Sequence, residues 1–298
     1  MSFLNRKRYV IAVSGGPDSM ALLHMYHKYV KAVCTVKYNK RPDCDFDVEC
    51  VKKLCSKYNL QLELLDVTEE IYNSINENNF QNKARIIRYD FFKEIAKKYN
   101  TNKILVAHHL DDFLETAYMQ QKQSTNLNFY GIKEITTLED GFEIHRPLIR
   151  KYRKSTLERY CQDFNIEYAI DSSNEMPIYE RNRVRKIIST WDTQKIHEFL
   201  KTIDKLNKNK QKEYKENLHK FNEWKKTDFS ISFLKALSKE QQVSLIYLFL
   251  QENKLYRQSF AKVKGIIEFI FGVNGKKYRL LENLYLVKLN NKVLISKE

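Results

Sequence analysis

The chain has 298 residues, with 52 Lys and Arg against 37 Asp and Glu, and a formal net charge of +15 at pH 7. A chain of this length buries about 75% of the surface that it exposes when unfolded, which excludes a small disulfide-held scaffold and predicts two domains. Apolar residues make up 43% of the sequence and aromatic residues 13%, which excludes wholesale disorder.

The cysteine pattern favours a reducing compartment, and the hydropathy indicates no membrane segment. The five cysteines are odd in number and form no CxxC pair, so neither a zinc site nor a disulfide framework is predicted. The sequence contains no run of 18 apolar residues, and its N-terminus, MSFLNRKRYVIAVSGG, lacks the apolar stretch and cleavage site of a signal peptide. We expect a soluble cytoplasmic protein without a membrane partner.

The positive charge is unevenly distributed. Residues 1–190 hold 30 basic and 25 acidic side chains, whereas residues 191–298 hold 22 and 12. A basic field of this size is typical of nucleic-acid binding. An AT-rich genome would also favour Lys, Asn, Ile and Tyr, so composition alone leaves both interpretations open.

Short β-rich runs alternate with amphipathic segments through the first 110 residues. Strands are predicted at Tyr9–Val13, Ala32–Lys37, Leu60–Val67 and Lys103–Ala107, and helices at Ser19–Tyr29, Phe46–Tyr58 and Asn82–Tyr99. This alternation predicts an α/β fold, a doubly wound parallel sheet covered on both faces. Ligands of such sheets bind outside the carboxyl ends of the strands, where the strand order reverses.

The rest of the chain has a mostly helical pattern. Helices are predicted at Arg153–Asn165, Pro177–Thr190, Lys239–Asn253 and Ser259–Phe271, with a long amphipathic stretch over residues 191–225. The last residues alternate as in a β-hairpin, with a turn at Asn290 and Asn291. We expect one domain over residues 1–190 and a smaller, basic, mostly helical region over residues 191–298 that ends in the hairpin.

A glycine loop, SGGPDS, follows the first predicted strand. Only seven glycines occur in the chain, and two of them are adjacent here. Glycines let the backbone approach a ligand, and the following helix N-terminus adds partial positive charge, so the loop predicts a phosphate cradle. The cradle consists of Ser14, Gly15, Gly16, Pro17, Asp18 and Ser19. The loop is neither a Walker A motif nor a dinucleotide GxGxxG motif.

An acid inside an anion cradle would repel phosphate unless its charge were offset. Asp18 therefore predicts a bound Mg²⁺ that bridges the carboxylate and pyrophosphate oxygens. An ordinary βα turn with Asp18 as a helix cap is the alternative. SGGPDS after an apolar strand resembles the PP-loop of the N-type ATP pyrophosphatases. The resemblance implies that ATP is cleaved between its α and β phosphates and that AMP passes to a substrate oxygen.

A second cluster, AHHLDDFLET, covers residues 107–116. Asp111, Asp112 and Glu115 share a helix face, and like charges this close destabilise one another unless they bind a cation. The alternative is an acidic first helical turn favoured by the helix dipole, which leaves the adjacent His108 and His109 unexplained. Carboxylates suit Mg²⁺ or a cationic substrate better than zinc.

Two further motifs are rich in arginine. RPLIRKYR covers residues 146–153, DSSNEMPIYERNRVR covers residues 171–185, and residues 146–186 contain ten basic and six acidic side chains with tyrosines between them. Arginine beside aromatic faces suits phosphate and splayed bases. A solvated helix face is the alternative interpretation.

Taken in this order, the four motifs resemble the tRNA(Ile)-lysidine synthetase family. ARIIRYDFF, residues 84–92, is similar to that family's AR..RY..F helix, and the resemblance covers residues 8–188. It implies an adenine nucleotide alpha hydrolase-like fold and an ATP-dependent carbon–nitrogen ligase. In that reaction ATP adenylates the C2 oxygen of the wobble cytidine of tRNA(Ile) with a CAU anticodon. The side-chain amine of free L-lysine then displaces AMP, which gives lysidine and AUA decoding.

The resemblance also implies roles for single residues. Asp18 would hold Mg²⁺, and Ser14, Gly15, Gly16 and Ser19 would bind pyrophosphate. Asp112 and Glu115 are the candidates for holding lysine, whose amine, with a pKa of ~10.4, is protonated at neutral pH. Asp111 or His108 would take a proton before the amine attacks, and the sequence leaves that choice open. The residues expected to bind tRNA or to order the site are Arg85, Arg88, Asn174, Arg181, Asn182 and Arg185.

Two segments depart from the family pattern. VKYNKR, residues 36–41, lacks the two histidines and the glycine of an H-V-N-H-G-L-R stretch, and QKQSTNLNFYG, residues 121–131, replaces an R-G-S-G-like loop. A PP-loop tRNA thiolase is an alternative, although such enzymes need catalytic cysteines or an iron–sulfur cluster. A small-molecule PP-loop amide ligase would need no basic tail, and the intact acids disfavour a non-enzymatic RNA-binding paralogue. The oligomeric state stays open, a homodimer included.

Overall fold

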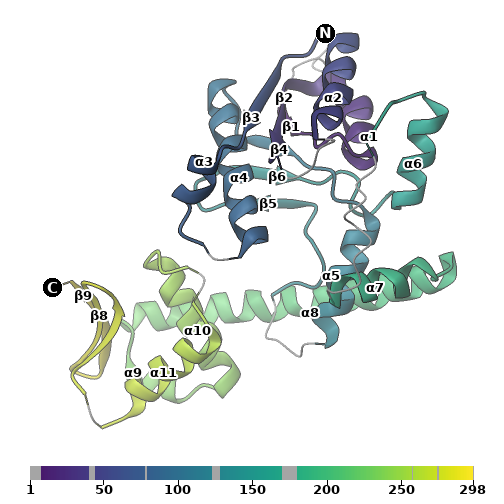
Figure 1. Ribbon diagram of the computed structural model, residues 1–298. Coiled ribbons are helices and arrows are strands. Elements are labelled where there is room, and N and C mark those ends of the chain that lie inside the picture. The colour runs from purple at the N-terminus through teal and green to yellow at the C-terminus, as the bar shows by residue number, and fades with distance from the viewer. Residues whose placement is uncertain are drawn as a thin grey trace, which may run out of the picture. The chain divides into compact units, whose positions relative to one another are not determined.

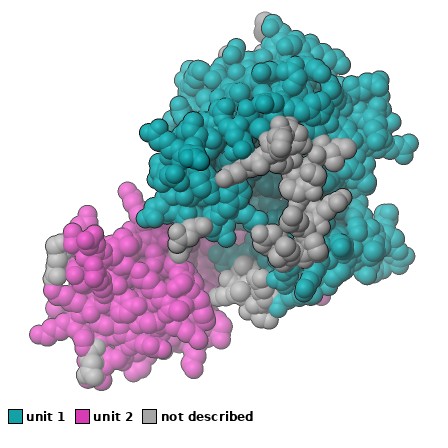
Figure 2. All heavy atoms as spheres, in the orientation of Figure 1, with its two compact units in different colours: residues 1–203 teal, residues 204–298 magenta. Residues whose placement is uncertain are grey.

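The computed structural model describes residues 8–39, 44–77, 79–122, 128–169, 180–256, 258–273 and 275–297. The chain divides into two compact units, residues 1–203 and residues 204–298 (Figure 2). The division falls inside one long helix, α8 (Thr193–Lys226). The domain boundary expected at residue 190 stays a prediction.

The first unit is built on a six-stranded sheet. Its strands are β1 (Tyr9–Ala12), β2 (Val30–Lys37), β3 (Leu62–Asp66), β4 (Lys103–Leu105), β5 (Ile135–Thr137) and β6 (Glu143–His145). Their order is β3-β2-β1-β4-β6-β5, and all neighbouring pairs are parallel except β5 with β6 (Figure 1). The predicted doubly wound α/β sheet is confirmed. The short strands β5 and β6 were not predicted.

Helices cover both faces of this sheet. They are α1 (Pro17–Tyr26), a 3₁₀ turn η1 (His27–Tyr29), α2 (Cys44–Tyr58), α3 (Glu69–Ser74), α4 (Phe80–Lys98), α5 (Leu110–Lys122), α6 (Lys154–Asp163) and α7 (Glu180–Ser189). Val10 and Ile11 are adjacent in β1 and both fully buried, Val10 in a core with α4 and Ile11 in a core with α1, α2 and α6. Apolar residues at successive strand positions therefore reflect burial on both faces.

The topology brings the two densest motifs of the sequence together. Because β1 lies between β2 and β4, the chain leaves β1 for β2 on one side and later returns to β4 on the other. The SGGPDS loop follows β1, and the AHHLDD segment follows the parallel neighbour β4. Both lie at the carboxyl edge where strand order reverses, the usual ligand position in such folds.

The second unit combines part of α8 with three helices and a small sheet. The other elements are α9 (Ile231–Lys235), α10 (Lys239–Glu252), α11 (Phe260–Phe271), β7 (Lys277–Leu281), β8 (Leu284–Leu289) and β9 (Lys292–Lys297). Its core surrounds Trp224, which is fully buried and donates its indole N–H to the Ser230 carbonyl at 2.8 Å.

The predicted hairpin is confirmed as β8 and β9, with β7 added on the other side of β8 in an antiparallel sheet. Asn290 and Asn291 have φ of 47° and 61°, the left-handed conformation that a two-residue hairpin turn needs. Within the described ranges, no helix is long and apolar enough to cross a membrane.

Candidate active site

The loop after β1 is held in one shape by backbone and hydroxyl contacts. Gly15 has a φ of 88°, and a Cβ there would lie 2.7 Å from the Asp47 carbonyl oxygen, so only glycine fits. The Ser19 hydroxyl donates to the Gly16 carbonyl at 2.9 Å and accepts the Ser14 N–H at 3.1 Å. The loop therefore leads rigidly into the N-terminus of α1, where an anion would meet positive helix charge.

Asp18 lies in the first turn of α1 and points at the segment after β4. Its Oδ2 is 3.6 Å from Nε2 of His109. Its Oδ1 is buried and has no hydrogen-bond partner among the described residues. A buried carboxylate oxygen without a donor is costly, so the site is built to receive a donor or a cation at this atom.

His109 lies at the centre of the acids. Its ring nitrogens are 3.6 Å from Asp18, 3.7 Å from Asp111 and 3.6 Å from Asp112. Burial alone would lower its pKa, but the hydrogen bond to Asp18 and the three carboxylate charges raise the pKa of His109 above its usual value. When it is protonated, the ring offsets part of the mutual repulsion of the acids. His109 has no role predicted from the sequence, although its place beside the acids after β4 is a signal for one.

The surroundings of His108 favour its neutral form, whereas those of His109 favour the protonated form. Nε of the Arg146 guanidinium donates to Nδ1 of His108 at 3.2 Å. Burial, together with the charges of Arg146, Arg181 and Arg85, lowers the pKa of His108 to about 4, although Asp112 works against that shift. His108 is therefore neutral at pH 7, and because Nδ1 accepts, Nε2 carries the proton.

Arg146, the first residue of the RPLIRKYR motif, is almost fully buried. Its Nη1 donates to the Lys133 carbonyl at 3.0 Å and to the Thr136 hydroxyl at 2.9 Å. These contacts join β5 to the segment after β4, and they fix the orientation of His108. The motif is visible in the sequence, but this role of Arg146 is not, because it depends on contacts across the sheet edge.

Asp111 is engaged by the other end of the same motif. Its Oδ1 accepts from Arg153 at 2.7 and 2.9 Å, and its Oδ2 accepts the Lys154 N–H at 2.8 Å. Arg153 also donates to the carbonyls of Ile188 and Trp191, each at 3.2 Å. Asp111 therefore ties α5 to the start of α6 and, through Arg153, to the end of α7.

Asp112 and Glu115 form a buried ion cluster with two arginines of α7. Glu115 is 1% exposed and accepts from Arg181 Nε at Oε2 and from Arg185 Nε at Oε1, both at 2.8 Å. Asp112 accepts the His109 N–H at 3.0 Å and Arg181 at 3.3 Å. Burial raises the pKa of Asp112, but the charges of His109 and His108 outweigh it and hold that pKa below its usual range.

The remaining predicted residues are spread over two helices. Arg85 stacks over the Tyr89 ring at 5.0 Å on α4 and lies close enough to His108 to affect its pKa. Arg88 donates to the Ala84 carbonyl at 3.3 Å, and Asn182 lies on α7. Asn174 lies outside the described residues.

The donor set fits a magnesium ion that arrives with ATP rather than a resident metal. No group of three or more His, Cys, Asp or Glu side chains in the described part of the chain could hold a metal ion by itself. Mg²⁺ commonly takes one or two carboxylates and completes its coordination with substrate phosphates and water. Asp18, with its unpartnered Oδ1 beside the phosphate cradle, supplies one such ligand.

Replacing Glu115 with glutamine is expected to lower the free energy of unfolding by about 2 kcal/mol, because the amide can accept from only one of the two arginines and no longer carries the buried charge that balances them. Chemical denaturation measures this change. The matched control is Glu158→Gln on α6, whose 3.9 Å ion pair with Lys154 is exposed and should contribute below about 0.5 kcal/mol. Equal effects of the two substitutions would contradict a structural role for the Glu115 cluster.

The lowered pKa of His108 predicts a pH dependence of stability. His108 binds a proton near pH 6.5 in the unfolded chain but only near pH 4 in the folded chain. Its neutral form therefore contributes to the free energy of unfolding above pH 6.5, and this contribution is lost as the pH falls toward 4. Between pH 7.5 and pH 5 this residue should remove about 2 kcal/mol of unfolding free energy. The pH dependence contributed by His109 has the opposite sign. Its protonated form stabilises the fold below pH 6.5, and this stabilisation is lost as the pH rises through the pKa of His109 in the folded chain.

Urea denaturation at the two pH values, with His108→Gln as the control, isolates the contribution of His108. His109 is present in both proteins, so its contribution to the pH dependence of stability cancels when the two proteins are compared. A variant that loses as much stability on acidification as the wild type would contradict a buried neutral His108.

Three comparisons with known proteins bear on this site. Residues 2–190 match the family described as the PP-loop domain. The tRNA(Ile)-lysidine synthase of Ureaplasma parvum serovar 3 is 44% identical over 98% of this chain and 88% of its own length. The enzyme of that name from Malacoplasma penetrans is 41% identical over 98% of this chain and 99% of its own length.

A solved structure adds information on the fold. The U34-tRNA thiolase NcsA from Methanococcus maripaludis superposes with a TM-score of 0.55 at 15% sequence identity, over 69% of this chain and 73% of its own. At that identity the likeness concerns the fold alone. On the near full-length matches, the chain belongs to the tRNA(Ile)-lysidine synthase family and carries its PP-loop domain in residues 2–190.

Proposed function

We propose that this chain joins the side-chain amine of free L-lysine to C2 of the wobble cytidine of tRNA(Ile) with a CAU anticodon, at the expense of ATP. The observation that carries the proposal is the meeting of a phosphate cradle after β1 with a buried acidic cluster after β4 at one sheet edge. The cradle suits a nucleotide triphosphate, and the acids suit an aminoalkyl cation. With these substrates, we expect the enzyme to act in the cytoplasm.

The first half-reaction uses the cradle. The C2 oxygen of cytidine attacks the α-phosphorus of ATP, the bond to the β-phosphate oxygen breaks, and pyrophosphate leaves. Ser14, Gly15, Gly16 and Ser19 would bind the leaving pyrophosphate at the N-terminus of α1. Mg²⁺ would neutralise phosphate charge when bound, with Asp18 as its protein ligand. When it is protonated, the His109 ring beside Asp18 adds charge of the same sign.

The second half-reaction uses the acidic cluster. Asp112 and Glu115 would attract the lysine ammonium group, and the amine nitrogen then attacks C2 of the cytidine while AMP leaves with its oxygen. Arg181 and Arg185 already pair with these acids, so lysine enters a cluster whose charge is partly balanced. The two arginines would therefore tune the affinity for lysine, as well as order the site.

The amine must lose a proton before it attacks, and the contacts favour one of the two candidate bases. Nε2 of His108 carries its own proton, because Nδ1 accepts from Arg146. His108 is therefore placed as a hydrogen-bond donor. The Asp111 carboxylate keeps free lone pairs in addition to those that accept from Arg153 and Lys154. We assign proton acceptance to Asp111.

The cysteines disfavour the thiolase alternative. Cys161, close to the loop, is fully buried, donates its thiol to the Pro17 carbonyl at 3.4 Å, and has its pKa raised by burial to about 12. Burial likewise raises the pKa of Cys55 to about 11. A sulfur carrier needs an accessible thiolate, which these thiols do not supply at neutral pH.

A pulse-chase with ATP labelled at the α-phosphate tests the order of events. Without lysine, label should attach to tRNA(Ile) bearing CAU while pyrophosphate is released. Addition of lysine should then release the label as AMP. Pyrophosphate release without any tRNA, in response to a small carboxylic acid, would instead support the amide-ligase alternative.

A further inference from the structure

A cavity of about 550 Å³ lies in the first unit, away from the site described above. It is lined by four tyrosines, Tyr9, Tyr26, Tyr29 and Tyr152, and by two cations, Arg8 and Lys151. We call it the tyrosine pocket. Tyr26 is the last residue of α1, whose first turn carries Asp18, so the helix rise separates these two residues by about 12 Å.

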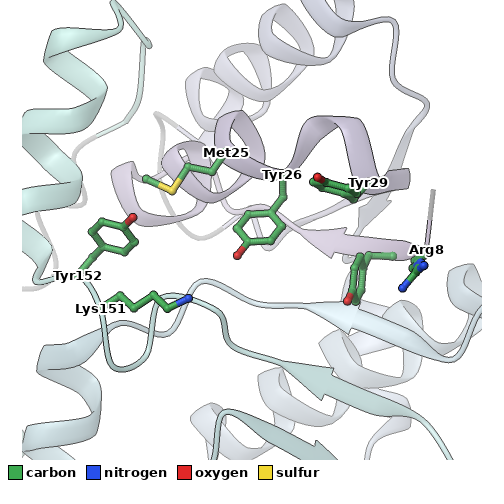
Figure 3. A pocket seen from close by; sticks show the side chains of 7 residues that line it. Arg8, Met25, Tyr26, Tyr29, Lys151 and Tyr152 are labelled. Carbon is green, nitrogen blue, oxygen red and sulfur yellow. The ribbon is translucent and has the colours of Figure 1, made fainter. Parts of the chain in front are cut away.

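The tyrosines are anchored while part of each side chain stays accessible. Tyr9, Tyr26 and Tyr152 pack against the buried core of the first unit. The Tyr9 ring meets the His145 ring edge-on at 5.3 Å, and the Tyr26 and Tyr29 rings lie 6.4 Å apart. Lys151 and Tyr152 face Tyr26 across the opening, with Arg8 and Tyr29 toward one end (Figure 3). The pocket therefore offers aromatic surface without a large entropy cost of ordering.

The charged side chains that line the pocket are both positive, and among the described residues no acidic side chain lines it. Glu134 is the nearby acid: burial, and then the neighbours Tyr152, Tyr9 and Glu134, raise the pKa of Tyr26. Both Arg8 and Lys151 are exposed, and neither side chain forms an ion pair with any residue that the structure describes. Aromatic faces beside unpaired cations are the combination that binds an unstacked base and its phosphate.

We propose that the tyrosine pocket binds one nucleotide of the tRNA substrate, with the base against the tyrosines and the phosphodiester against Arg8 and Lys151. This proposal rests on the proposed function for the identity of the RNA. A nucleotide has the same chemistry when it is free in solution, but the pocket lies at the C-terminal end of α1, where the helix dipole is negative. That end disfavours a triphosphate more than the single charge of a phosphodiester.

The pocket wall is continuous with the active site along the chain. The Tyr152 carbonyl accepts the N–H of Leu110, the first residue of α5, at 2.9 Å. The next residue, Arg153, binds Asp111. A nucleotide seated against Tyr152 would therefore contact the segment that holds the acidic helix in place.

The test is tRNA binding by the full chain carrying Arg8→Glu and Lys151→Glu together. Binding of tRNA(Ile) is measured by filter retention over a range of salt concentrations, and binding of free AMP by equilibrium dialysis. The control carries Lys52→Glu, an exposed lysine of α2 outside the pocket. Thermal melting and ATP binding verify that each variant is folded. A second variant, Tyr29→Leu, removes an exposed ring and leaves the charge unchanged.

The double variant should weaken tRNA binding at least about tenfold and flatten the slope of log affinity against log salt by about one or more. Tyr29→Leu should weaken binding without changing the slope. Loss of one bound AMP per chain with unchanged tRNA affinity would overturn the RNA assignment in favour of a free nucleotide. Effects no larger than those of Lys52→Glu would overturn the proposal altogether. These binding measurements need no turnover, so failure of wild-type lysidine formation would be seen separately.

Discussion

Replacing Asp18 with asparagine is expected to lower lysine-dependent release of pyrophosphate at least about 100-fold, the range found when a preorganised electrostatic group is removed. Oδ1 of Asp18 is buried and has no hydrogen-bond partner in the described part of the chain, and Oδ2 faces His109. Asparagine keeps the size of the side chain but removes the charge that would hold Mg²⁺. The loss should appear in kcat/KM for ATP.

The fold should survive this substitution, because it removes one of three carboxylates around His109 and with it the repulsion between Asp18 and the other two acids. The pKa of His109 should fall toward its usual value, since Asp18 is among the causes that raise it. NMR titration of the histidine ring measures that shift independently of turnover. Asp163→Asn, at an exposed position of α6, is the matched control. Turnover within threefold of wild type would remove Asp18 from the reaction.

Gly15→Ala should lower the free energy of unfolding much more than Gly16→Ala does. At Gly15 a Cβ would lie 2.7 Å from the carbonyl oxygen and 2.9 Å from the Cα of Asp47, and the φ of 88° is unfavourable for alanine. Backbone atoms of α2 cannot rotate away, so we expect a loss of about 2–4 kcal/mol of unfolding free energy. At Gly16 the nearest atom is the Ser14 hydroxyl at 3.7 Å, an ordinary contact.

Gly16→Ala should therefore change the unfolding free energy of the ligand-free protein by less than about 1 kcal/mol. Chemical denaturation of both variants, without nucleotide, gives the comparison. If the two alanine variants were equally stable, the close approach of the loop to α2 would be contradicted.

Much of the fold could be predicted from the sequence, because the burial pattern is local. The runs at Tyr9–Ala12 and Val30–Lys37 are apolar at successive positions, which indicates strands covered on both faces. β5 and β6 have only three residues each, and their pairing depends on a sheet already formed. β7 pairs with β8 across a turn of only two residues, Glu282 and Asn283, so this pairing is local, as is that of the hairpin at Asn290 and Asn291.

In the candidate site, too, the local features could be predicted from the sequence and the long-range contacts could not. The chemistry-bearing loops follow from strand alternation and from the rule for ligands at strand ends, and the structure places them at one edge. The partners of the acids could not be predicted. Glu115 pairs with arginines 66 and 70 residues later, and Arg146 binds a histidine 38 residues earlier. Sequence spacing carries no information on such contacts, and the opposite shifts of the His108 and His109 pKa values depend on them.

The central claim is that this chain forms lysidine on one particular tRNA. The most direct measurement incubates the purified protein with ATP, Mg²⁺, labelled lysine and tRNA(Ile) bearing CAU, and then determines the mass of the wobble nucleoside. We predict lysine incorporated at that cytidine, and none in methionine tRNA with the same anticodon. ATP cleavage with no lysine in the nucleoside would contradict the assignment, even though it would leave the PP-loop chemistry in place.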